Sequence, residues 1–131
     1  MRIVNPIGVL GEDIAVDYLK RKGYKITERN SRKKYEEVDI IAVQAPPRGA
    51  LPRRGSTLVF IEVKTRTSSA YGSPFESIVG FKLAHLVRTA QFYKLIHPNL
   101  PDDLRIAAIG IIVTPDNRLE KIEHLENISG F

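Results

Sequence analysis

The sequence predicts an α/β protein in which helices pack on a mixed β-sheet of about five strands. Several apolar runs rich in β-branched residues have the length of strands, and two longer segments repeat apolar residues at helical spacing. The order of these segments is α-β-β-β-α-β-β. Consecutive strands suit an antiparallel meander, and a helix between two strands suits a parallel crossover.

Composition narrows the class of protein further. With 131 residues, the chain has the size of one domain, and we expect a single domain over residues 1–131. The absence of cysteine excludes disulfides, thiolate zinc sites and a cysteine nucleophile. The three histidines are scattered, so any bound metal should be a hard ion held by oxygen ligands. Without a long apolar stretch or a signal-peptide pattern, the sequence predicts a cytoplasmic protein with no membrane partner.

The net charge is +5, from 20 Lys and Arg against 15 Asp and Glu. A positive balance suits a polyanionic partner such as nucleic acid, although many basic proteins bind none. The charge alone does not distinguish DNA from RNA.

The first helix should begin at Asn5-Pro6, a capping side chain followed by proline, and end near Gly23. Its apolar stripe consists of Ile7, Leu10, Gly11, Ile14, Ala15 and Tyr18. Glu12 lies at the edge of this stripe. It either looks past the helix toward what the helix covers or remains a solvated surface glutamate.

Two strands follow: an irregular one at Tyr24–Arg29 and a second at Val38–Val43. Asp39 stands among the apolar residues of the second strand, where aspartate is disfavoured, and asks for an explanation. Residues 45–56 contain three prolines, two glycines and three arginines, so we expect a flexible basic loop. Arg53 and Arg54 in this loop, and Arg32 before the second strand, are candidate nucleic-acid contacts. For the loop arginines, a solvated insertion is the plainer interpretation.

The central strand should be Thr57–Thr67, which opens as an unbroken apolar run and then carries Glu62 and Lys64. Side chains alternate faces along a strand, so these two charges share a face. Burying them is costly unless they pair with each other or act on a substrate. The remaining elements are a helix at about Phe81–Ile96 and strands at Ile106–Val113 and Leu119–Leu125.

The acidic residues of the two neighbouring strands suggest a metal site. Cross-strand neighbours lie about 5 Å apart, so Asp39 and Glu62 could share one divalent cation. Mg²⁺ or Mn²⁺ fits a few carboxylates, with water and phosphate oxygens as the remaining ligands. Glu12 could add a carboxylate, and Lys64 could orient a water or stabilise charge on a phosphodiester under attack.

Several segments of the chain carry a resemblance to a known family. They are Gly11-Glu12-Asp13 with Ala15, Leu19 and Gly23-Tyr24; Glu37-Val38-Asp39-Ile40-Ile41-Ala42; Leu58-Val59-Phe60-Ile61-Glu62-Val63-Lys64-Thr65-Arg66; Tyr71-Gly72-Ser73-Pro74 with Glu76; and Lys82. Together they resemble the YraN family of uncharacterised bacterial proteins (uncharacterised protein family 0102), over roughly residues 7 to 95. Ser31, Glu36 and Arg105-Ile106-Ala107 depart from the family pattern, and the loop at 45–56 is longer than usual.

The resemblance implies a restriction-endonuclease-like, resolvase-like core, because the family is similar to Holliday-junction resolvases and other PD-(D/E)xK nucleases. By this likeness Glu12, Asp39, Glu62 and Lys64 would be the catalytic residues of a Mg²⁺-dependent endonuclease acting on structured or branched DNA. Asp39, Glu62 and Glu12 would hold the metal. Lys82 and Arg66 would contact nucleic acid, with Arg32, Arg53 and Arg54. Analogy with resolvases also suggests a homodimer.

Two other interpretations remain open at this point. The chain could be a non-catalytic nucleic-acid-binding protein that keeps the fold, which predicts salt-dependent binding without metal-dependent turnover. It could also be a structural or adaptor protein in which Glu62 and Lys64 form only an ion pair.

Overall fold

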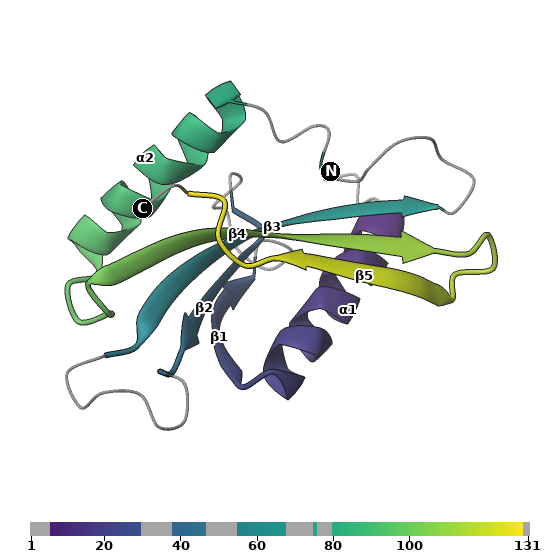
Figure 1. Ribbon diagram of the computed structural model, residues 1–131, viewed down its shortest axis with the longest axis horizontal. Helices are drawn as coiled ribbons and strands as arrows, with labels where there is room; N and C mark the ends of the chain where they lie inside the picture. Colours follow the sequence, from purple (N-terminus) through teal and green to yellow (C-terminus); the bar gives the residue numbers. More distant parts are fainter. Residues whose placement is uncertain (1–5, 30–37, 47–54, 68–74, 76–79, 130–131) are drawn as a thin grey trace.

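The computed structural model describes residues 6–29, 38–46, 55–67, 75 and 80–129. One five-stranded sheet, in the order β1-β2-β3-β4-β5, has a helix on each face (Figure 1). The elements are α1 (Pro6–Arg21), β1 (Tyr24–Arg29), β2 (Ile40–Gln44), β3 (Thr57–Thr67), α2 (Gly80–Ile96), β4 (Asp103–Val113) and β5 (Leu119–Leu125). Neither described helix is long and apolar enough to cross a membrane.

The strand pairing follows the predicted order. β1, β2 and β3 form an antiparallel meander, β3 and β4 pair in parallel after the α2 crossover, and β5 returns antiparallel to β4. β3 pairs with β4 along its whole length, whereas the shorter β2 pairs with β3 only from Thr57 to Ile61. The second half of β3 therefore extends past the end of β2.

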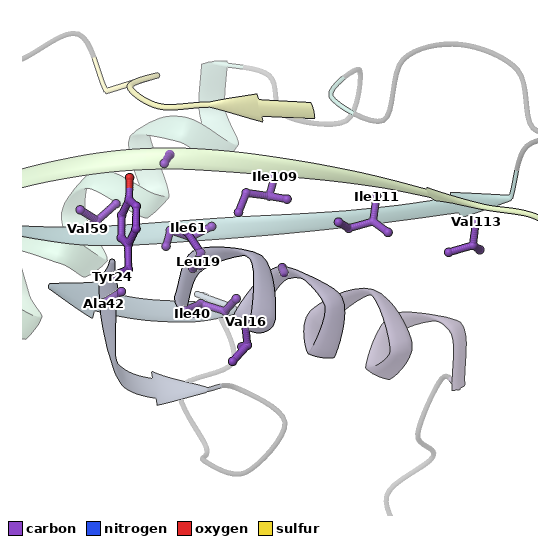
Figure 2. Packing of buried hydrophobic residues seen from close by; sticks show 12 residues of the cluster. Val16, Leu19, Tyr24, Ile40, Ala42, Val59, Ile61, Ile109, Ile111 and Val113 are labelled. Carbon is purple, nitrogen blue, oxygen red and sulfur yellow. The ribbon is translucent and has the colours of Figure 1, made fainter. Parts of the chain in front are cut away.

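Helix α1 covers the face of the sheet that carries the odd-numbered residues of β3 and β4. Figure 2 shows this cluster, in which side chains from α1 meet alternate residues of the central strands. Its fully buried members include Leu19, Val59, Ile61, Ile109 and Ile111. The alternation of apolar residues along the strands thus supplies one continuous core under the helix.

The approach of α1 to β3 is closest at Gly11. A Cβ atom added there would lie 2.8 Å from the Cβ of Thr65, nearer than real Cβ atoms approach. Glycine therefore lets the helix backbone lie directly against the second half of β3. The neighbouring residue on the helix is Glu12, so this contact sets the position of that carboxylate.

Helix α2 covers the opposite face. Leu86, Ala90 and Tyr93 are buried against even-numbered residues of β3 and β4, as the predicted stripe of this helix requires. Tyr93 meets Phe60 edge to face, with ring centroids 5.6 Å apart. This cluster ends at Phe60, so the even-numbered face of β3 changes from apolar to charged at Glu62.

The structure corrects several predicted details. β2 begins at Ile40 and not at Val38, because the Asp39 carboxylate takes a backbone hydrogen bond where a strand residue would continue the ladder. β4 begins at Asp103, three residues before the predicted start, because Thr57 and its neighbours pair with this segment. Glu12 is buried, so its interpretation as a solvated surface residue is wrong. The expected irregularity of β1 is a register shift between Ile26 and Glu28.

Some predictions fall outside the described residues. They concern the helix cap at Asn5, the arginines Arg32, Arg53 and Arg54, and most of the loop at 45–56.

Candidate functional site

Glu62 is the centre of the charged cluster on β3. It follows the apolar run of the strand, and only 6% of its surface is exposed. Its neighbour across the parallel pairing is Ala108, and the next neighbour, opposite Lys64, is Gly110. These small residues leave room beside the two charged side chains.

Two lysines approach the same carboxylate oxygen of Glu62. The Nζ atom of Lys82, from the first turn of α2, lies 2.8 Å from Oε1, and that of Lys64 lies 3.4 Å away. Both lysine side chains are about two-thirds buried or more, with 30% and 27% of their surface exposed. Strand alternation brings Lys64 to Glu62, and the rotation of α2 brings Lys82.

Asp39 lies just before β2, next to this cluster. Because Ile40 pairs with Ile61, Asp39 stands at the position that would face Glu62 if the ladder continued. Its Oδ2 atom accepts a hydrogen bond from the backbone N–H of Val63 at 2.8 Å. The carboxylate thus replaces the missing strand partner at the point where β3 extends beyond β2.

Glu12 reaches the site from the α1 side of the sheet. Its Oε1 atom accepts a hydrogen bond from Nε of Arg29 at 3.2 Å, and Arg29 also pairs with Asp13. Only 7% of the surface of Glu12 is exposed. A buried carboxylate needs a partner of opposite charge, and Arg29 is that partner for Glu12.

The carboxylates of this region affect one another electrostatically. Burial, with the negative charges of Glu62 and Glu12, raises the pKa of Asp39 to about 7, although the hydrogen bond from Val63 and the charge of Lys64 oppose this. At neutral pH Asp39 is therefore poised between its protonated and ionised forms. A neighbouring cation would favour the ionised form.

The two lysines respond to the site in opposite directions. Burial and the neighbouring Lys82 lower the pKa of Lys64, and the charge of Glu62 compensates only in part. Burial also works against the charge of Lys82, but its hydrogen bond to Glu62 outweighs this and raises the pKa of Lys82. Lys82 is thus the main counter-ion of Glu62.

The donor set suits a hard divalent cation in part. Asp39 and Glu62 are adjacent carboxylates, and the pKa of Asp39 is raised by burial and then by the negative charge of Glu62. However, no three acidic or histidine side chains within the described ranges form a group that could hold a metal ion. A metal at this place would be held by Asp39 and Glu62, while Glu12 is engaged by Arg29.

The structure brings together most of the residues that the sequence singled out. Asp39, Glu62 and Lys64 lie in one cluster with Lys82, which the sequence placed only as a phosphate contact. Arg66 follows on the same face of β3, because alternate residues of a strand share a face.

Sequence reasoning missed two contacts of this region. The ion pair of Arg29 with Glu12 could have been expected, since a buried glutamate needs a cation and β1 directly follows α1. The contact of Lys82 with Glu62 had no comparable signal, because it depends on how α2 is rotated. A separate polar cluster lies at the other end of the sheet, where Arg105 donates hydrogen bonds to Tyr24 and Gln44.

The fold and this cluster define the class of protein: an α/β protein with a resolvase-like core and a cluster of carboxylates and lysines around Glu62 of its central strand. A sequence model described as Uncharacterised protein family UPF0102 matches residues 11–111, and the chain belongs to this family.

Relatives from several bacteria match over most of their length. The UPF0102 protein of Alkaliphilus oremlandii is 39% identical over 121 residues, which cover 92% of this chain and 95% of the relative. That of Chlorobium phaeobacteroides is 39% identical over 129 residues, 95% of this chain and 94% of the relative. That of Renibacterium salmoninarum is 34% identical over 128 residues, 98% of this chain and 99% of the relative.

Proposed function

We propose that this protein is a cytoplasmic endonuclease, dependent on Mg²⁺ or Mn²⁺, that hydrolyses phosphodiester bonds in structured or branched DNA. The observation that carries the proposal is a pair of carboxylates, Asp39 just before the start of β2 and Glu62 on β3. Asp39 and Glu62 lie next to each other with Lys64 on the same face. Burial, followed by the charge of Glu62, raises the pKa of Asp39 to about 7. Strongly shifted pKa values of neighbouring acidic groups are typical of functional sites.

Each residue of the cluster has a role in this proposal. Asp39 and Glu62 would hold the cation, which when bound supplies polarisation of the scissile phosphate. Lys64, whose pKa is lowered by burial and by Lys82, would orient the attacking water or stabilise charge on the phosphate. Glu12 would add negative potential from the α1 side, and Lys82 would contact a phosphate of the DNA.

The two lysines also suit a polyanionic substrate. In the protein alone, Lys82 and Lys64 both lie near Glu62. A cation at Glu62 would compete with them for this carboxylate, which leaves their ammonium groups for phosphate oxygens. Binding of the metal would thus strengthen binding of the substrate, and binding of the substrate would strengthen that of the metal.

The test is a cleavage assay with labelled linear, flapped and four-way DNA in Mg²⁺, Mn²⁺ or EDTA. We expect metal-dependent products from the wild type and a loss of at least about a hundredfold in rate for Glu62→Gln, since a site carboxylate is removed. The matched control is Asp17→Asn, which neutralises an exposed carboxylate on α1, away from the cluster. It should cleave like the wild type.

Metal binding is measured separately from cleavage, by thermal unfolding. A ligand that binds only the folded state raises the melting temperature. We expect Mg²⁺ to raise the melting temperature of the wild type and of Asp17→Asn, and to have a smaller effect on that of Glu62→Gln. Cleavage that is unchanged in Glu62→Gln would reject this site.

A non-catalytic nucleic-acid-binding protein is the second candidate. The observation that favours it is the closed contact of Lys82 with Glu62 at 2.8 Å, which satisfies this carboxylate without a metal. Tight, salt-sensitive DNA binding without products in either metal would support this second function over the first.

A further inference from the structure

The edge strand β5 has a charge pattern that is complementary to itself. Its sequence from Leu119 to Leu125 places Lys121 and Glu123 symmetrically around Ile122. Of the strands that the structure describes, only β4 pairs with β5, so the other edge of β5 has no described strand beside it (Figure 1). We propose that this edge binds the same edge of a second copy of the chain, so that two sheets join into one.

Symmetry restricts how two such edges can pair. A two-fold axis perpendicular to the sheet makes the two β5 strands antiparallel and keeps each residue on its own face. Residues that face each other across the joint must then lie on the same face of the sheet. This allows only registers in which one central residue stands opposite its own copy. Near the middle of β5 the candidates for this central residue are Lys121, Ile122 and Glu123.

Charge distinguishes these three registers. Centring on Lys121 places two lysines face to face, and centring on Glu123 places two glutamates face to face. Both are unfavourable for directly opposed strand residues. Centring on Ile122 pairs each Lys121 with Glu123 of the other copy and the two isoleucines with each other. Of the three registers, only this one places unlike charges opposite each other.

The residues on either side agree with the register centred on Ile122. It places Glu120 opposite His124 and brings Leu119 toward Leu125, both of which are exposed in the single chain, at 48% and 42%. A register shift at Ile112 and Val113 bends the start of β5 at Leu119 and Glu120, which face Leu125 and His124 of the other copy. The regular part of the joint is therefore Lys121 to Glu123 of each copy.

The charged residues at the centre are accessible for such a contact. Within one chain, Lys121 Nζ lies 2.9 Å from Glu123 Oε1, and the two side chains are 61% and 32% exposed. In the joined sheets these two ion pairs would meet and form a ring of four alternating charges. Such a ring favours this register over the others, because unlike charges that face each other across two strands stabilise the pairing and like charges destabilise it.

The joint has a geometric consequence that rests on the proposed function. A perpendicular two-fold axis keeps the Glu62 and Lys64 clusters of both copies on the same face of the joined sheet. From β3 to its copy there are five strand spacings of about 4.8 Å, or roughly 24 Å. A pair of copies would therefore present two related sites to one substrate. The joint itself follows from β5 alone and is tested without DNA.

The experiment measures the mass of the full chain by sedimentation equilibrium. One strand pair is a small interface, so we expect weak association with a dissociation constant in the range of about 1 to 100 µM. The mass should rise from 14.7 kDa toward twice this value as the concentration passes through that range. A wild type that stays at the mass of one chain up to about 500 µM would overturn the proposal.

Charge reversal tests the register. Lys121→Glu places four carboxylates at the joint and Glu123→Lys places four ammonium groups, so each variant alone should associate at least about tenfold more weakly. The double variant, with both substitutions, restores the alternation and should associate like the wild type. An equal mixture of the two single variants should also associate, because unlike charges again face each other. Single variants that associate as strongly as the wild type would place the contact elsewhere.

Folding of each variant is checked by circular dichroism and thermal unfolding. The exposed ion pair within the chain contributes little, so we expect all variants to fold. Hydrogen exchange of the wild type provides a measurement that needs no variant. The β5 amides that point away from β4 should exchange more slowly as the concentration rises, and rates independent of concentration would contradict the joint.

Discussion

At the scale of single residues, Asp39 is the side chain with the clearest conflict between structure and stability. It lies next to Glu62, and burial and this neighbour raise its pKa to about 7. Its hydrogen bond from Val63 N–H closes the end of the β2–β3 ladder, which explains why an acidic residue is found there. Ionising this buried carboxylate lowers the stability of the folded chain. Residues that cost stability in this way are typical of functional sites.

This conflict predicts how stability depends on pH. The folded-state pKa of Asp39, about 7, lies above the ordinary value of 3.8, so the folded chain holds this proton more tightly than the unfolded chain. The contribution to the free energy of unfolding is therefore fully present below about pH 4 and is lost as the pH rises through 7. In Asp39→Asn the acceptor for Val63 remains but the charge cannot form.

We expect Asp39→Asn to be more stable than the wild type above about pH 8, by on the order of 4 kcal/mol for a pKa that rises from 3.8 to about 7. The difference should shrink toward about pH 4, and urea unfolding across this range measures it. Asp17→Asn, a change of an exposed carboxylate on α1, is the control and should show no such trend. If the difference between Asp39→Asn and the wild type were constant across this range, the assigned pKa would be wrong.

At the scale of elements, the contact of α1 with β3 determines where Glu12 lies. Gly11 is in contact with Thr65 in the part of β3 that extends past β2. The stripe predicted from the sequence correctly placed Gly11 and Ala15 toward the sheet. It did not place Glu12 there, because the buried side of a helix depends on what it packs against as well as on its own periodicity.

We expect Gly11→Ala to destabilise the protein by about 1 to 3 kcal/mol, because the added methyl group meets the Thr65 side chain and forces α1 away from β3. This outcome runs against helix propensity, which favours alanine by about 1 kcal/mol. Denaturant unfolding measures the change.

The double variant with Thr65→Ala tests the cause. It removes the threonine Oγ1 and Cγ2 atoms but leaves Cβ, so we expect part of the lost stability to return. Effects of the two substitutions that simply add would show that the clash is not the reason.

At the scale of the whole molecule, the positive charge that could bind nucleic acid is concentrated on one face of the sheet. The net charge of +5 favours a polyanion over the entire surface, whereas Lys64 and Arg66 concentrate positive charge on one face of β3. Phosphate contacts release bound counterions, so the salt dependence of binding reports how many such contacts form.

We expect Arg66→Gln to weaken DNA binding several-fold and to reduce the slope of log K against log salt by about 1, for the loss of one phosphate contact. Titrations of fluorescent DNA at several salt concentrations measure both quantities. Arg21→Gln at the end of α1 is the control, because this arginine pairs with Asp17 away from β3. An equal loss of affinity and slope in both variants would indicate general charge attraction and no specific face.

Local patterns predicted most of the fold, and long-range contacts account for what they missed. The apolar run of β3, its charged second half and the crossover helix were readable because each depends on neighbouring residues. The contacts of Lys82 with Glu62 and of Arg29 with Glu12 join separate elements, so they depend on helix rotation and strand register. The start of β2 was misplaced for the same reason, since Asp39 has a strand-like sequence context but a hydrogen bond to β3.

The parallel pairing of β3 with β4 also affects the order in which contacts form during folding. Each pair, from Thr57 with Asp103 to Thr67 with Val113, joins residues 46 positions apart. The meander from β1 to β3 can close over shorter loops, whereas the sheet centre must wait for the whole α2 crossover. The lysine that α2 supplies to Glu62 therefore arrives with the slowest contacts. A newly made chain holds the carboxylates of its site without their main counter-ion until the fold is nearly complete.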